Sequence, residues 1–359
     1  MTVQDIDRQS AFSGTRPAAD EIDAARLAFY LDQHLAGFRG PLALARFKGG
    51  QSNPTYLLTA ASGRYVLRRK PPGKLLPSAH AIEREYRVTA ALAGVDFPVA
   101  RPLHYCTDES VIGTEFYVME HVEGRVFWEP WAPGLAADER AQLFGSLNRT
   151  IARLHKLDPG ALGLAGFGKG EGYVARQIKR WSEQYRASAE EPIAEMDRLI
   201  AWLPQACPAQ GASAIVHGDF RLDNCIVSAG KPEVAAVLDW ELATLGDPLA
   251  DYTYHLMMWW MPRSAHGGGV GSLLGHERHP GLPAIETYIE EYCTLTGRDF
   301  IPDLDVYLAY NFFRIAAILQ GIIGRVRDGT AANRNAALMA SEVRPLAETA
   351  WRFARQAGA

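Results

Sequence analysis

The spacing of hydrophobic and polar positions divides the chain into a region of mixed periodicity and a longer helical region. Residues 20–35 carry apolar side chains at helical spacing, with Asp20 as the expected N-cap and Gly37 as the expected terminator. Alternating positions then predict a small antiparallel sheet with one crossing helix at 79–93. Its strands are expected at 42–47, 55–59, 64–69, 101–106 and 115–120.

After Gly124 the chain becomes mainly helical, with apolar residues at intervals of three and four. Helices are predicted at 138–155, 173–187, 192–203, 251–261, 283–296, 303–326 and 331–354. Short apolar strands are predicted at 214–216, 225–227 and 234–238. We therefore predict an α+β fold with an N-terminal lobe at 1–122 and a helical C-terminal lobe at 123–359, which contains a catalytic loop at 215–240.

Two segments lack periodicity. Residues 1–13 are polar, and we expect them to be disordered. Residues 262–282 are rich in Gly, Ser and His, and we expect a long loop there. Neither segment is expected to add a helix or a strand to the predicted lobes.

Three polar residues beside the short strands form a pattern typical of phosphoryl transfer. Asp219 precedes Asn224 by five positions, and Asp239 ends an apolar run. In such sites one carboxylate orients the attacking hydroxyl, while an amide oxygen and a second carboxylate hold metal ions. The pattern predicts Asp219 as the catalytic base and Asn224 and Asp239 as metal ligands. The alternative, that Asp219 and Asn224 only shape a hairpin, is disfavoured by the neighbouring motif residues.

Those neighbours also separate the chain from protein kinases. Gly218 stands where protein kinases carry arginine, and Trp240-Glu241 stands where they carry Phe-Gly. In these positions the chain resembles the aminoglycoside phosphotransferase family of small-molecule kinases. The resemblance implies a two-lobed, protein-kinase-like fold, ATP and Mg²⁺ as cofactors, and a small-molecule hydroxyl as phosphate acceptor.

A phosphoryl-transfer site also needs backbone N–H groups and a cation near the phosphates. Glycines and small polar residues between the first two strands suit a phosphate-covering loop, although Gly-Gly is also ordinary hairpin chemistry. The candidates there are Gly49, Gly50, Ser52 and Asn53. The cation is left open between Arg68 and Lys70, which share one strand face. The resemblance implies Arg68, because the family's cation directly follows the apolar residues of this strand.

The resemblance supplies two further expectations. It implies that Glu85, rather than Glu83, pairs with the strand cation. It also implies that residues 115–124 form the hinge, with the backbone of Glu120 and Val122 on the adenine and Met119 lining its pocket. For Glu83 and Glu85 the alternative is a solvated acidic helix face. For residues 115–124 it is an edge strand that only links the lobes.

Composition and net charge limit the classes of partner that the chain is expected to bind. The net charge of −4 predicts neither nucleic acid nor an anionic membrane as partner. The most apolar stretch, 252–261, is too short for a bilayer of about 30 Å, and no signal peptide is visible. The four cysteines lack metal-ligand spacing, and we expect reduced thiols in the cytoplasm. A homodimer is left open.

Several other polar residues are expected either to support the catalytic loop or to contact the substrate. His155 and His217 are expected to be architectural, and Asp247 and Asp251 to brace the catalytic loop. The segment 303–328 mixes aromatic residues with Arg314, Gln320, Arg325 and Arg327. Such a mixture would suit an anionic or acyl-type acceptor better than a polycation. A core helix with solvated arginines is an equally good interpretation.

A wider likeness suggests an acceptor. Residues 49–56, 68–73, 82–86 and 220–224 look like the kinase-like domain fused to certain acyl-CoA dehydrogenases, with the likeness running from about 45 to 255. It implies phosphorylation of hydroxyacyl-CoA thioesters. The rival hypotheses are an aminoglycoside or macrolide phosphotransferase and a nucleotide-binding pseudokinase scaffold. Retention of Asp219 argues against the scaffold, because a binding module does not need a base.

Overall fold

The described residues of the computed structural model form two compact units. These residues are 15–17, 22–48, 53–71, 81–263, 271–276, 278–329 and 336–359. Unit 1 comprises Met1–Val126, Asn224–Gly230 and Val234–Ala243, and unit 2 comprises Phe127–Asp223, Lys231–Glu233 and Thr244–Ala359. The sequence placed 215–240 whole in the helical lobe, whereas the structure divides this stretch between the two units.

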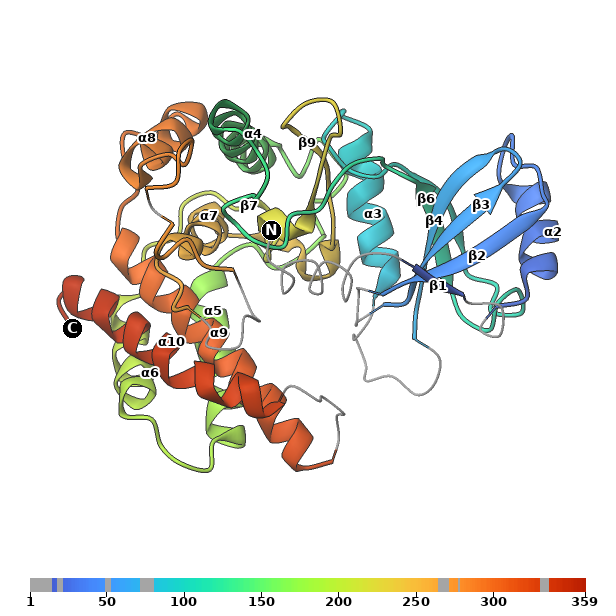
Figure 1. Cartoon of the computed structure of the whole chain (residues 1–359). Coiled ribbons are helices and arrows are strands. Elements are labelled where there is room, and N and C mark those ends of the chain that lie inside the picture. Colours follow the sequence, from blue (N-terminus) through green and yellow to red (C-terminus); the bar gives the residue numbers. More distant parts are fainter. Residues whose placement is uncertain are drawn as a thin grey trace. The chain divides into compact units, whose positions relative to one another are not determined.

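Unit 1 is built on an antiparallel sheet (Figure 1), whose described strands follow the order β1-β2-β3-β4-β6-β5. The strands are β1 (Thr15–Pro17), β2 (Leu42–Phe47), β3 (Thr55–Ala60), β4 (Gly63–Arg69), β5 (Pro102–Cys106) and β6 (Phe116–Glu120). Helix α2 (Ala24–His34) buries Leu27 and Leu31 in the core on one face of this sheet. Apolar burial on that face, favourable by roughly 25 cal/mol per Å², is what stabilises the unit.

Alternation along β4 and β6 sorts their side chains between two faces. Leu67 and Val118 belong to the core beneath α2. Their neighbours Arg68 and Tyr117 instead contact Glu85 of helix α3 (Ile82–Ala93). Because successive side chains of a strand point to opposite faces, one face forms the core and the other carries charged groups.

A hairpin from the middle of the chain completes unit 1. It consists of β8 (Cys225–Val227) and β9 (Val234–Val237). Val237 bridges to Val99, and the N–H of Arg125 donates to the carbonyl oxygen of Val227 at 2.8 Å. A Cβ at Gly124 would lie 2.3 Å from that same oxygen, so this close approach requires glycine.

Unit 2 is mainly helical (Figure 1). Its helices are α4 (Ala137–Lys156), α5 (Tyr173–Ser188), α6 (Ala194–Ala206), α7 (Pro248–Leu256), α8 (Ile285–Thr296), α9 (Leu304–Arg327) and α10 (Ala336–Gln356). Strands β7 (Ala214–Val216) and β10 (Thr244–Gly246) pair antiparallel. A short 3₁₀ turn occupies Met257–Trp259 in unit 2, another at Trp240–Leu242 belongs to unit 1, and a third at Leu222–Asn224 lies where the chain passes from unit 2 to unit 1.

Helix α9 is the central helix of unit 2 and packs against α10, α5 and α7. Within the described part of the chain, it is the one helix long and apolar enough to cross a membrane, at a mean hydropathy of 1.5. However, 72% of that apolar stretch is buried inside the fold. Its hydrophobicity is therefore accounted for by packing, as in the core helix of a large domain.

The structure moves two predicted helix starts. Asp23, not Asp20, is the N-cap of α2, because its carboxylate accepts from the N–H groups of Ala25 and Arg26 at 3.0 Å; Asp20 lies outside the described residues. The helix expected at 251–261 begins at Pro248, where Asp247 caps it. The tail 1–13 also lies outside the described residues.

Candidate active site

Arg68 is a buried cation that contacts several carboxylates of unit 1. Its Nε is 2.6 Å from Oε2 of Glu85, and one terminal nitrogen is 2.9 Å from Oδ1 of Asp239. The Arg68 and Glu85 side chains are only 11% and 2% exposed. Burial lowers the pKa of Arg68, but the carboxylates, Glu85 foremost, outweigh it and raise the pKa overall. Arg68 is therefore a permanent cation.

Lys70 has a different partner. Its Nζ contacts Oε2 of Glu115 at 2.7 Å, and the hydroxyl of Tyr105 donates to the same oxygen at 2.9 Å. Of the two cations left open by the sequence, the structure thus brings Arg68, and not Lys70, together with Glu85. Asn53 supports this pair, because its amide donates to Oε1 of Glu85 at 2.6 Å.

We expect Arg68→Met to lower the free energy of unfolding by about 3 kcal/mol, because it leaves Glu85 buried without its charge partner. Lys70→Met is the matched control, one residue beyond the end of the same strand. It removes a part-exposed pair and should cost less than about 1 kcal/mol. Urea denaturation of both variants measures the difference, and equal losses would contradict the assigned pairing.

Asn224 and Asp239 stand at the start of β8 and just after β9. The N–H of Leu238 donates to the carbonyl oxygen of Asn224 at 2.8 Å, so the hairpin brings the two predicted metal ligands near each other. Asp239 has φ 62°, a left-handed conformation that Asp and Asn tolerate better than most residues. Its side chain is 38% exposed. One carboxylate and one amide are hard oxygen donors that fit Mg²⁺, which takes its other ligands from phosphates and water.

The structure describes some of the other residues predicted to bind the nucleotide. Met119 and Glu120 end β6, a strand paired on both sides, so the edge-strand alternative is wrong. The N–H of Glu120 donates to the carbonyl oxygen of Arg101 at 3.0 Å, so this N–H is already bonded within unit 1. Val122 follows in an extended segment and is half-buried. Gly49, Gly50 and Ser52 lie outside the described residues.

The loop that carries Asp219 follows β7 in unit 2. The hydroxyl of Tyr254 donates to Oδ1 of Asp219 at 2.5 Å, and Nε of Arg221 lies 3.5 Å from the same oxygen. Arg221 also pairs with Asp223 at 2.5 Å. Asp219 is therefore held on one carboxylate oxygen by groups from two different elements.

Asp251 braces this loop from α7, as predicted. Its two carboxylate oxygens each accept a backbone N–H, from His217 and Gly218, at 2.7 Å. His155 contacts the same carboxylate at 3.2 Å. Burial raises the pKa of Asp251, but His155 and the other donors outweigh it, so its pKa is lowered and it remains an anion. Gly218 has φ 82°, which explains why glycine stands there.

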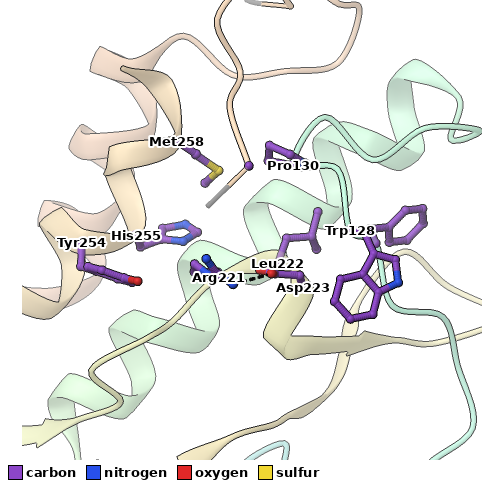
Figure 2. Close-up of a pocket in the computed structure, with 10 residues that line it drawn as sticks. Trp128, Pro130, Arg221, Leu222, Asp223, Tyr254, His255 and Met258 are labelled. Atoms are coloured by element: carbon purple, nitrogen blue, oxygen red, sulfur yellow. Dashed lines mark hydrogen bonds and ion pairs between the residues drawn. The ribbon is translucent and has the colours of Figure 1, made fainter. Parts of the chain in front are cut away.

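A pocket opens beside this loop (Figure 2). Its apolar wall includes Phe127, Trp128, Pro130, Leu222 and Met258, and its polar residues are Arg221, Asp223, Tyr254 and His255. Figure 2 shows Trp128 and Tyr254 on opposite sides of Arg221. Two lining residues, Tyr254 and Arg221, are those that contact Asp219. A carboxylate held beside a concave apolar surface can accept a proton from a hydroxyl bound there.

Comparison with known proteins decides the family. A model of the phosphotransferase enzyme family matches residues 43–285. The chain belongs to this phosphotransferase family. It is 43% identical over 342 residues to acyl-CoA dehydrogenase family member 11 of Rattus norvegicus, covering 94% of this chain and 44% of that protein. The chain thus spans less than half the length of the curated relatives it matches.

Solved structures agree with the assignment. A protein from Ralstonia eutropha JMP134, described provisionally as an aminoglycoside phosphotransferase, is 45% identical with a TM-score of 0.83, covering 93% of this chain and 98% of that one. Choline kinase from Cryptosporidium parvum is 10% identical with a TM-score of 0.65, covering 93% and 97%. The predicted α+β, protein-kinase-like fold of the chain is confirmed.

The structure shows what the polar residues of 303–328 contact, and it adds one residue to the site. Arg314, Gln320 and Arg327 bond to carbonyl oxygens of Gly218 and Ser188, and none of the three lines the pocket described above. Arg314 is buried and not solvated, so the segment is a core helix but its arginines are not all in solvent. Tyr254, which contacts Asp219, was not identified from the sequence. A tyrosine hydroxyl inside an apolar helix, three residues after Asp251, could have indicated it.

We expect His255 to make the stability of the fold sensitive to pH. Burial lowers its pKa from 6.5 to about 4. The unfolded chain binds a proton at His255 below about pH 6.5, before the folded state does, so acidification favours unfolding by about 2 kcal/mol between pH 7 and pH 5. Urea denaturation at both pH values should show a smaller loss in His255→Gln. The same loss in that variant would assign the effect to other groups.

Proposed function

We propose that this protein is an ATP- and Mg²⁺-dependent kinase that transfers the γ-phosphoryl group to a hydroxyl of a small molecule. The observation that carries the proposal is Asp219, held on one oxygen by Tyr254 and Arg221, two residues that also line the pocket. Asp219 would accept the proton of the attacking hydroxyl. A scaffold has no use for a carboxylate held in this way.

Unit 1 supplies groups suited to the nucleotide. Arg68, oriented by Glu85, would bind phosphate oxygens as a bidentate cation. Asn224 and Asp239 would hold Mg²⁺, which neutralises charge on the phosphates when bound. Gly49, Gly50 and Ser52 would cover the phosphates, and the segment at Met119, Glu120 and Val122 would receive the adenine.

For the acceptor we propose a molecule that is apolar and uncharged next to its reacting hydroxyl, of the hydroxyacyl-CoA type. The pocket wall is apolar and aromatic, and its arginine is paired with Asp223. An ammonium group buried against such a wall would have to compete with Arg221 for the carboxylate of Asp223, which makes its burial costly. The relatives named as acyl-CoA dehydrogenase family members support the same acceptor class. An antibiotic acceptor is the second candidate, favoured by the description of the Ralstonia protein.

A substrate screen tests both. Purified protein with Mg-ATP is offered 3-hydroxybutyryl-CoA, glucose, choline, kanamycin and erythromycin, with ADP release and the phosphorylated product measured by mass spectrometry. We expect transfer to the acyl-CoA. Transfer to kanamycin or erythromycin alone would favour the second candidate. Tight Mg-ATP binding with no transfer and no ATP hydrolysis would support a pseudokinase instead.

A further inference from the structure

Tyr254 and Arg314 form a buried support for the loop that carries Asp219. The hydroxyl of Tyr254 reaches Oδ1 of Asp219, and the tyrosine is only 4% exposed. Arg314, from α9, lies over the Tyr254 ring at 5.0 Å and donates to the carbonyl oxygen of Gly218 at 2.8 Å. The two residues thus contact both the carboxylate of Asp219 and the peptide group that precedes it.

The chemistry of this support favours a fixed geometry. Burial raises the pKa of Tyr254, so its hydroxyl keeps its proton and donates it in the bond to Asp219. Because the Tyr254 hydroxyl is buried, water does not compete for it as a donor, which strengthens its bond to the partly exposed Asp219. Guanidinium stacking on the ring, together with the bond to Gly218, restrains Tyr254 and the loop at the same time.

We propose that Tyr254 is a positioning residue, whose hydroxyl orients the Asp219 carboxylate for proton transfer while Arg314 holds Tyr254 and Gly218 in place. The inference rests on the proposed role of Asp219 as base. The acceptor O–H gives its proton to the Asp219 carboxylate as its oxygen bonds to the γ-phosphorus, and the bond from that phosphorus to the bridging oxygen breaks to release ADP.

Tyr254→Phe tests this role, because it removes only the hydroxyl and keeps the ring beneath Arg314. Tyr252→Phe is the matched control. It removes a hydroxyl from the same helix and is fully buried, but its partner is the carbonyl oxygen of Tyr288 at 3.1 Å. Steady-state kinetics are measured with 3-hydroxybutyryl-CoA and, as a second readout, with water as acceptor through Mg-ATP hydrolysis. Thermal denaturation of both variants runs alongside.

We expect kcat to fall about 10- to 100-fold in Tyr254→Phe, as for a displaced catalytic group, with KM for ATP unchanged. Tyr252→Phe should keep the wild-type kcat, and both variants should lose similar amounts in Tm. Equal kcat in the two variants would overturn the inference, as would a fall in kcat that comes with a larger loss in Tm and a raised KM. Failure of the proposed function is separate: Asp219→Asn would then behave as the wild type.

Discussion

Replacing Asp219 by asparagine is expected to lower kcat by about 10²- to 10⁴-fold, the usual effect of removing a general base. Asparagine keeps the shape of the side chain, and its amide oxygen can still accept from the hydroxyl of Tyr254. Only the ability to take a proton is lost. Binding of Mg-ATP, measured by titration calorimetry, should stay at the wild-type level, because the groups proposed for the nucleotide belong to unit 1.

Asp158→Asn is a suitable control for this variant. Asp158 also belongs to unit 2, and its carboxylate accepts a local bond from the N–H of Gly160 at 2.8 Å in an exposed turn. Its replacement should leave kcat unchanged. Wild-type turnover in Asp219→Asn would remove the residue from the reaction, and loss of Mg-ATP binding would show that its role is not confined to the acceptor.

Asp239→Asn is expected to lose both turnover and Mg-ATP affinity, by about 10²-fold or more in kcat, because the metal loses its proposed carboxylate ligand. Asparagine is the informative replacement. Asp239 has φ 62°, and alanine there would add backbone strain to the loss of the ligand. Arg68 would keep its bond to Glu85, so the cluster should remain folded. Mg-ATP titrations at several Mg²⁺ concentrations measure the effect.

The chain offers a matched control in the same unit. Asp96 also has a left-handed backbone, with φ 57°, but lies exposed in a turn after α3. Asp96→Asn should therefore keep kcat, Mg-ATP affinity and Tm. If Asp239→Asn bound Mg-ATP as tightly as Asp96→Asn does, the residue would not be a metal ligand.

How far the sequence predicts the structure differs between elements. Strand β2 and the short strands β7 and β8 have the predicted bounds, because each is an apolar run between clear turn residues. Strands β1 and β10 were missed. Each has only three residues, which is too short for alternation to be visible, and each exists because it pairs with a strand elsewhere in the chain.

The candidate site, like the fold, was predicted only in part from the sequence. The spacing of Asp219, Asn224 and Asp239 was sufficient to predict phosphoryl-transfer chemistry, and the family assignment agrees. The choice between Arg68 and Lys70 was not accessible, because both alternate onto one strand face and only their partners differ. Those partners are set by how α3 and the loop before β6 pack on the sheet.

By itself, then, the sequence determined the kind of chemistry, the order of its residues and the periodicity that builds the sheet and helices. These depend on residue type and on interactions between near neighbours. Tertiary structure decided which partners contact the candidate site residues. Arg68 contacts Asp239, 171 positions away in the sequence, and Tyr254 contacts Asp219, 35 positions away. Contacts at such separations arise only when elements pack, so no local pattern can specify them.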